Sequence, residues 1–230
     1  MTSPNDIASF IDHTALKPET TDEQIRTLCF EADKFGFAAV CVMPYWVPRC
    51  SMVLEQLGSR VEIATTIGFP IGSHQTVVKV AETKKAIHDG ATEVDMVINV
   101  GALKSGLRAV VMADIMAVVM TAHESGVIVK AIIETSLLTH DEKLRACELV
   151  GEAQADFIKT STGFAGGGAT VDDIILMRNA SPERVRIKAS GGIRDAETAL
   201  RMIDAGAVRI GTSSGVAIIG ATSEVEKTLR

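Results

Sequence analysis

Two lysines that follow apolar runs are the residues of this sequence best suited to chemistry. Lys159 lies in "DFIKTSTG" and Lys188 in "VRIKASGG". A lysine amine attacks a carbonyl only when it is unprotonated, and burial beside a second ammonium lowers its pKa towards neutrality. The imine that it forms is an electron sink, which allows a neighbouring C–C or C–H bond to break. The pair is therefore a candidate nucleophile with its activator, although spacing does not rank one lysine above the other.

Seven β-branched runs alternate with longer amphipathic stretches along the chain, and a shorter eighth run precedes them. The runs span residues 9–14, 37–43, 61–69, 93–100, 127–135, 156–161, 184–190 and 207–213. The stretches between them are long enough for helices, and the stretch 20–36 opens with a Thr21–Gln24 capping pattern and closes with Gly36. The alternation predicts parallel strands joined by helices.

About eight such units in 230 residues predict an α/β fold with a single domain over residues 1–230. The expected architecture is a closed (β/α)8 TIM barrel of parallel strands with a short N-terminal segment. An open doubly wound sheet is the alternative. That fold favours a G-x-G-x-x-G turn after its first strand, whereas the first clear run here ends in "CVMPYW".

Strand periodicity indicates which charged residues face the barrel interior, because successive side chains alternate between the two faces of a strand. The inward residues of run 93–100 are expected to be Glu93, Asp95, Val97 and Asn99. Lys159 and Lys188 lie near the C-terminal ends of their runs, where the active sites of barrels form, and Asp95 would be their interior carboxylate. Lys130 lies earlier in its run, and we interpret it as a member of a structural ion pair.

Glycine-rich turns follow the last two predicted strands, in "KASGGIRD" (188–195) and "RIGTSSG" (209–215). Barrels commonly hold phosphate at this place, where backbone N–H groups of glycine turns and helix N-termini point at the anion. The candidate residues are Gly191, Gly192, Gly211, Ser213 and Ser214. The alternative is that these glycines only form tight turns. The "AGGG" at 165–168 is interpreted as a mobile loop.

Composition excludes several other classes of function. A net charge of -6 argues against nucleic acid as a partner, and no apolar run is long enough to cross a membrane. The cysteines, which form no C-x-x-C pair and follow no secretory leader, indicate a reducing cytoplasm; they are Cys29, Cys41, Cys50 and Cys147. The histidines show no metal-site spacing, so no metal ion is expected. Cys41 taken alone is best read as a small buried apolar residue.

Five segments together resemble the deoxyribose-phosphate aldolases. They are "IDHTAL" (11–16), "VCVMP" (40–44), "EVDMVINVGALKSG" (93–106), "FIKTSTGF" (157–164) and "IKASGGIR" (187–194). The resemblance covers nearly the whole chain. It implies a class I aldolase of deoxyribose phosphate catabolism that reversibly cleaves 2-deoxy-D-ribose 5-phosphate into D-glyceraldehyde 3-phosphate and acetaldehyde. The implied reaction proceeds through a lysine Schiff base and needs neither a metal ion nor another cofactor.

The resemblance also assigns roles to single residues. It implies that Lys159 forms the Schiff base, that Lys188 lowers the pKa of Lys159, and that Asp95 positions a water molecule. Asp12 would lie near the proton relay and Cys41 near the substrate. The other substrate-binding and phosphate-binding residues that it implies are Thr160, Gly163, Gly191, Gly192, Gly211, Ser213 and Ser214.

Two positions depart from the pattern of the family. Some members carry a lysine after "TSTG" that helps to hold phosphate, whereas this chain has Phe164, so we expect either a lower affinity for phosphate or Arg194 as the substitute for that cation. Met43 lies where other members often have Asn or Tyr.

Two rival functions are compatible with the same fold. One is another sugar-phosphate barrel enzyme, either an isomerase or a different Schiff-base aldolase. The other is a barrel that binds a sugar phosphate without catalysis, which has little reason to keep two lysines at the barrel rim. The expected partners are a small phosphorylated sugar, acetaldehyde and further copies of the chain, in a homodimer or a larger homo-oligomer.

Overall fold

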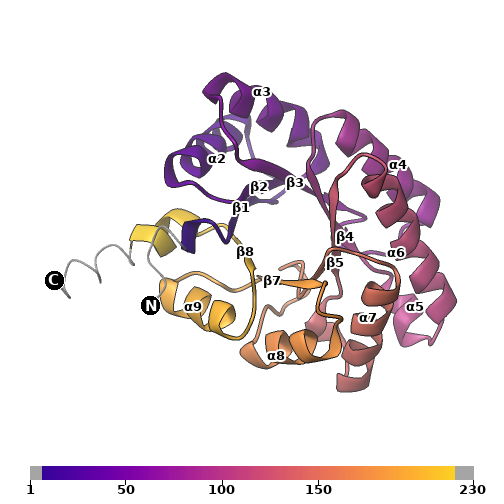
Figure 1. Ribbon diagram of the computed structural model, residues 1–230. Coiled ribbons are helices and arrows are strands. Elements are labelled where there is room, and N and C mark those ends of the chain that lie inside the picture. Colours follow the sequence, from indigo (N-terminus) through magenta and orange to yellow (C-terminus); the bar gives the residue numbers. More distant parts are fainter. Residues whose placement is uncertain (1–6, 221–230) are drawn as a thin grey trace.

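A computed structural model describes residues 7–220 and shows eight parallel strands closed into a barrel (Figure 1). Each strand pairs with the next one along the chain, and the last pairs with the first. The strands are β1 (Ile11–Ala15), β2 (Ala39–Val42), β3 (Glu62–Ile67), β4 (Glu93–Val97), β5 (Ile128–Ile132), β6 (Phe157–Lys159), β7 (Arg186–Ser190) and β8 (Arg209–Thr212). The predicted barrel is confirmed, including its first strand, β1.

The helices surround the barrel on the outside (Figure 1). They are α2 (Asp22–Phe35), α3 (Val47–Leu57), α4 (Thr76–His88), α5 (Val100–Lys104), α6 (Arg108–His123), α7 (His140–Glu152), α8 (Val171–Ala180) and α9 (Ala196–Asp204), with 3-10 turns η1 (Pro44–Trp46) and η2 (Thr135–Leu137). The Thr21–Gln24 pattern forms the capping box of α2, and Gly36 ends that helix in the left-handed conformation. These local signals fix where the chain turns back towards the next strand.

Strand register places the charged residues side by side. Asp95 of β4 is the partner of Lys130 in β5, and Lys159 of β6 is the partner of Lys188 in β7. Paired residues of neighbouring parallel strands point to the same face, so these four side chains share the barrel interior. The expected strand 93–100 is shorter than predicted: β4 ends at Val97, and the side chain of Asn99 caps α5 by accepting the Ala102 N–H.

A buried aromatic ring lies beneath the charged layer. Phe157 is 2% exposed, and the guanidinium of Arg186 lies 4.0 Å from its ring centroid. Arg209 and Lys130 also lie over this ring, at 5.9 and 6.0 Å. Cations above an aromatic face are attracted by its quadrupole. The Phe157 ring therefore packs between Arg186 and the two network cations Lys130 and Arg209.

A buried ion pair outside the barrel fastens α4 to α6. The ammonium of Lys79 contacts the carboxylate of Asp114 and donates to the carbonyl oxygen of Val97 at 2.8 Å. Both side chains are almost completely buried, and removing one partner of such a pair leaves a costly unpaired charge. The contact with Val97 fixes the C-terminal end of β4, two residues beyond Asp95.

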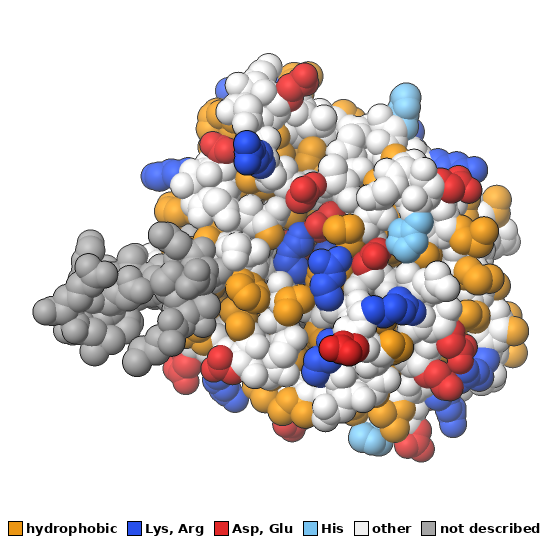
Figure 2. Space-filling view, viewed as in Figure 1, with side chains coloured by type: hydrophobic (Ala, Val, Ile, Leu, Met, Phe, Trp, Pro, Cys, Tyr) orange, Lys and Arg blue, Asp and Glu red, His pale blue; other side chains and the backbone are white. Residues whose placement is uncertain are grey.

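The surface carries mixed charges. On the face shown in Figure 2, described Lys and Arg side chains are interspersed with Asp and Glu and form no extended basic area. Within residues 7–220, none of the helices has the length and apolar character needed to span a bilayer.

Candidate active site

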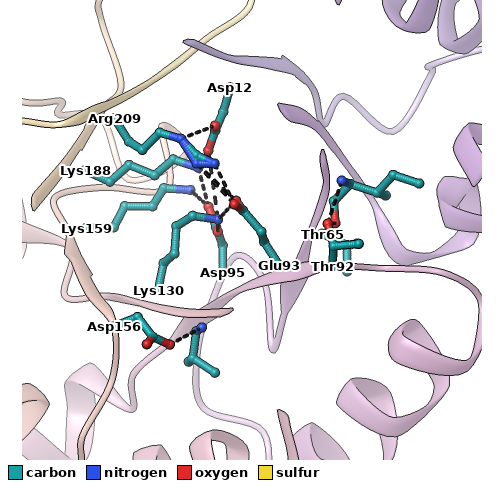
Figure 3. Close-up of polar contacts among 12 residues, drawn as sticks. Asp12, Thr65, Thr92, Glu93, Asp95, Lys130, Asp156, Lys159, Lys188 and Arg209 are labelled. Carbon is teal, nitrogen blue, oxygen red and sulfur yellow. Dashed lines mark hydrogen bonds and ion pairs between the residues drawn. The ribbon is translucent and has the colours of Figure 1, made fainter. Parts of the chain in front are cut away.

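Charged side chains from six of the eight strands meet inside the barrel (Figure 3). The group comprises Asp12 of β1, Glu93 and Asp95 of β4, Lys130 of β5, Lys159 of β6, Lys188 of β7 and Arg209 of β8, and all of these side chains are buried. These residues lie far apart in the sequence. They meet because they point to the same face of neighbouring parallel strands and lie at similar heights in the barrel. The inward positions predicted for Glu93, Asp95, Lys159 and Lys188 are confirmed.

Asp95 is the centre of the group. Its Oδ2 accepts hydrogen bonds from the ammonium groups of Lys159 and Lys188, both at 2.7 Å, and its Oδ1 accepts one from Lys130 at 2.8 Å. Burial opposes its ionisation, but the three lysines outweigh burial and hold the pKa of Asp95 well below its ordinary value. Asp95 is therefore a carboxylate in the folded protein.

Lys188 and Lys130 are each fixed by two carboxylates. Lys188 donates to Asp12 as well as to Asp95, and Lys130 lies 2.5 Å from Glu93 as well as 2.8 Å from Asp95. Burial favours the neutral amine in both cases, yet the carboxylates outweigh it and raise both pKa values. Both lysines are therefore ammonium ions. The ion pair predicted for Lys130 is confirmed.

Lys159 differs from the other two lysines in its contacts and in its access to solvent. It pairs with Asp95 alone, and its pKa is lowered, because burial and repulsion by Lys188 outweigh the attraction of Asp95. It also lines a cavity of about 840 Å³ at the C-terminal end of the barrel, which Lys188 and Lys130 do not line. Of the three interior lysines, Lys159 is thus the one that combines an easily lost proton with a path to a ligand.

The cavity wall contains most of the residues predicted to bind substrate. Gly163, Gly191, Gly192, Arg194, Gly211 and Ser213 line it. Phe164 lines it as well, with its ring in an edge contact with Phe69 at 5.3 Å. An aromatic pair therefore stands where some family members are expected to have a lysine.

The other predicted residues lie behind this wall. Asp12 and Cys41 are buried, Asp12 in contact with the Lys188 ammonium, and Ser214 donates its N–H to the Thr212 hydroxyl. The hydroxyl of Thr160 accepts the Ser190 N–H and donates to the Ser190 carbonyl, both at 3.0 Å. Thr160 thus joins the end of β6 to β7 instead of facing the cavity.

Two glycines permit close approaches that shape the site. A Cβ on Gly211 would lie 3.2 Å from the Cε of Lys188, so the absence of a side chain gives the lysine stem its path. A Cβ on Gly168 would lie 2.3 Å from the carbonyl oxygen of Gly191. The segment 165–168, interpreted from sequence as a mobile loop, therefore packs against the Gly191 turn, and Ala169 donates its N–H to the same oxygen at 3.1 Å.

Three residues of the site were not singled out by the sequence. His13 and Lys17 line the cavity, and the Nε2 of His13 lies 2.7 Å from Glu31. Glu134 is buried in a left-handed conformation with φ 54° and accepts hydrogen bonds from the N–H and the hydroxyl of Thr162. His13 lies next to Asp12 in the chain, which could have marked it. The positive φ of Glu134 has no signal in the sequence.

The chain matches proteins of known family over almost its whole length. The model of the DeoC/LacD family aldolases matches residues 7–221. A deoxyribose-phosphate aldolase of Thermococcus gammatolerans is 55% identical over 221 residues, which cover 96% of this chain and 98% of the relative. Deoxyribose-phosphate aldolase 1 of Bacillus licheniformis is 56% identical over 213 residues, which cover 93% and 94%.

A solved structure supports the same relationship. The deoxyribose phosphate aldolase of Aeropyrum pernix, described as a unique tetramer, superimposes with a TM-score of 0.90 at 32% identity over 98% of this chain and 94% of its own. The resemblance inferred from the five sequence segments is confirmed. On the strength of its sequence, its barrel and these relatives, this chain belongs to the DeoC/LacD family of aldolases.

Proposed function

We propose that this aldolase reversibly cleaves 2-deoxy-D-ribose 5-phosphate into D-glyceraldehyde 3-phosphate and acetaldehyde, with Lys159 as the nucleophile. The observation that carries the proposal is the position of Lys159, an amine with a lowered pKa that reaches the cavity from the centre of a charged network. The relatives named deoxyribose-phosphate aldolase support the choice of substrate.

The proposed reaction begins with the neutral amine of Lys159. It attacks the C1 aldehyde of the open-chain sugar, and loss of water gives a protonated imine. Removal of the proton from the C3 hydroxyl then breaks the C2–C3 bond, whose electron pair moves into the imine to form an enamine. D-glyceraldehyde 3-phosphate leaves. Protonation of C2 and addition of water release acetaldehyde and return the amine.

Asp95 and Lys188 serve this sequence from fixed positions. Asp95 contacts the reacting nitrogen at 2.7 Å and stays ionised, so it can hold the water molecule that carries protons to and from substrate. Lys188 donates to the same carboxylate oxygen and repels the protonated form of Lys159. Asp12 pairs with Lys188 and keeps it charged.

The phosphate is proposed to lie against the Gly191–Gly192 turn and Ser213. Gly191 and Gly192 both have positive φ, at 88° and 78°, and they precede the cavity-lining Arg194. Backbone N–H groups of such turns bind anions, and a nearby guanidinium adds a charged donor. Arg194 would supply the cation that Phe164 does not.

The proposal is tested by trapping the imine. Incubation with acetaldehyde and borohydride is expected to add one reduced two-carbon unit to Lys159, because an imine is reduced where it forms. Peptide mass spectrometry locates the adduct, and the adduct should form equally in the presence of EDTA. An isomerase or a binding protein would give no adduct, and an adduct on Lys188 or Lys130 would reassign the nucleophile.

The Lys188→Leu variant is expected to lose most of its activity near neutral pH and to recover part of it as the pH rises. Without the Lys188 ammonium, Asp12 and Asp95 attract the protonated form of Lys159 more strongly, so the pKa of Lys159 rises and alkali is needed to produce the neutral amine. The pH dependence of kcat/KM measures this change. A profile that is only scaled down, without an alkaline shift, would mean that Lys188 contacts substrate or relays protons.

We further propose a cytoplasmic homo-oligomer. The four cysteines are free and buried, as in proteins of a reducing compartment. An apolar stripe on α6 supports self-association: Val110, Met116 and Met120 are 49%, 41% and 60% exposed. The tetrameric relative from Aeropyrum pernix is compatible with this assembly.

A further inference from the structure

The interior of the barrel holds more positive than negative charge. Among the described residues of the network, each at most 8% exposed, four cations face three carboxylates: Lys130, Lys159, Lys188 and Arg209 against Asp12, Glu93 and Asp95. With every group ionised, one positive charge is in excess. An uncompensated charge is costly in a medium of low dielectric constant. The network therefore favours the loss of one proton.

Lys159 is the member of the network with the weakest hold on its proton. Its Nζ pairs with one carboxylate, Asp95. Lys188 and Lys130 each pair with two carboxylates within 2.8 Å. Arg209 keeps its charge, because a guanidinium is not deprotonated in proteins. The imbalance is thus relieved at Lys159.

Lys130 and Glu93 lie one layer below the nucleophile and contribute one charge each to this balance. Lys130 occupies Oδ1 of Asp95, while Lys159 and Lys188 share Oδ2. Neither Lys130 nor Glu93 lines the cavity, so neither is placed to touch the substrate. Any effect that Lys130 and Glu93 have on the reaction is therefore indirect and acts through the ion pairs of the charged network.

We propose that Lys130 and Glu93 are positioning residues that control the protonation state of Lys159 by setting the charge balance of the interior network. The inference rests on the proposed role of Lys159 as nucleophile. Lys130 supplies the cation that places the network in positive excess, and Glu93 limits that excess. The pKa of Lys130 supports this assignment. Burial lowers this pKa, but attraction by Asp95 and Glu93 outweighs burial and raises the pKa above its ordinary value, so Lys130 stays charged while Lys159 titrates.

The other groups around Lys159 are consistent with this balance. The titratable residues of the network come from β1 (Asp12), β2 (Cys41), β4 (Glu93 and Asp95), β5 (Lys130), β7 (Lys188) and β8 (Arg209). Burial raises the pKa of the Cys41 thiol, so Cys41 is neutral and adds no charge. Burial alone would raise the pKa of Asp12, but Lys188, Lys130 and Arg209 lower it, so Asp12 counts as an anion.

The test is the titration of the Lys159 amine in charge variants. Competitive acetylation with acetic anhydride, read from the mass of the Lys159 peptide, gives the pKa without requiring catalysis. Lys130→Met balances the network with Lys159 protonated, so the pKa should rise by about one unit or more, with a roughly tenfold loss of kcat/KM on the acidic limb. Glu93→Gln enlarges the positive excess, so the pKa should fall.

The double variant and a matched control decide the interpretation. Lys130→Met with Glu93→Gln removes one charge of each sign and should return the pKa towards that of the unaltered chain. Lys79→Met removes an equally buried, ion-paired lysine outside the barrel and should leave the pKa of Lys159 unchanged. Single variants that shift the pKa in the same direction, or leave it unmoved, would overturn the inference.

Folding and the proposed function are checked separately. Circular dichroism verifies each variant, and if Lys130→Met does not fold, Arg209→Met removes a different cation of the network and should also raise the pKa of Lys159. Failure of the unaltered chain to form an acetaldehyde adduct on Lys159 would refute the proposed nucleophile. An adduct accompanied by unshifted titrations would refute the role of Lys130 and Glu93 alone.

Discussion

Replacement of Lys159 by alanine is expected to abolish the acetaldehyde adduct and turnover at every pH. The variant lacks the amine proposed to form the imine, and the neighbouring lysines are poor substitutes, because Lys188 and Lys130 are fully buried ammonium ions that do not line the cavity. A change of pH cannot restore a missing nucleophile, which separates this variant from Lys188→Leu. The measurements are borohydride trapping and kcat/KM across the pH range in which the protein is folded.

The fold of Lys159→Ala is expected to survive, because the substitution leaves three cations facing three carboxylates. Lys159→Met, which retains an apolar stem of similar length, is the control for the space left behind. Both variants should show the circular dichroism of the unaltered chain. Residual turnover with a lysine adduct elsewhere would move the nucleophile to another position.

Asp95→Asn is expected to form the imine but to turn over about 10² to 10⁴ times more slowly, the usual contribution of a positioned acid–base group. The amide keeps the shape of the side chain and leaves the repulsion between Lys188 and Lys159 in place. Loss of the negative charge also removes the attraction that raises the pKa of Lys159. The neutral amine should therefore be available at lower pH than in the unaltered chain.

Single-turnover trapping and steady-state turnover separate the two effects of this substitution. The rate of adduct formation with acetaldehyde should be retained while kcat falls. Equal losses in both would show that Asp95 acts mainly by placing the Lys159 amine rather than by moving protons. The matched variant Asp114→Asn, which alters the buried carboxylate between α4 and α6, should change stability without this separation.

The barrel and the inward lysines were predictable because local physics determines them. Side chains alternate between the two faces of a strand, so the sequence assigns a face to every strand residue. The short apolar runs, separated by capped helices, give the order of the strands. The sequence alone therefore groups Lys159, Lys188 and Asp95. The position of Lys130 in an ion pair followed from its depth in the strand.

Features that depend on two distant segments could not be predicted in the same way. Periodicity treats Lys159 and Lys188 alike, and only the cavity and the second carboxylate on Lys188 distinguish them. The glycines at 165–168 signal freedom of the backbone, whereas Gly168 is needed because another turn lies against it. The engagement of Thr160 with Ser190 depends on the spacing of two strand ends, which composition does not encode.

Phe157 and the cations stacked on it fill the barrel interior beneath the cavity, which lies at the C-terminal end of the barrel with Lys159 among its lining residues. Lys159 lies at its floor, and the Gly191 turn, Ser213 and Phe164 lie along its wall. In the proposed reaction the two-carbon fragment stays bonded to Lys159 as an enamine after the C2–C3 bond breaks, whereas the phosphorylated fragment is then free. In the cleavage direction the phosphorylated fragment must depart first and acetaldehyde last, and in synthesis acetaldehyde must enter first. Product inhibition by acetaldehyde is therefore expected to follow an ordered kinetic pattern, which the attachment of the two-carbon fragment to Lys159 imposes.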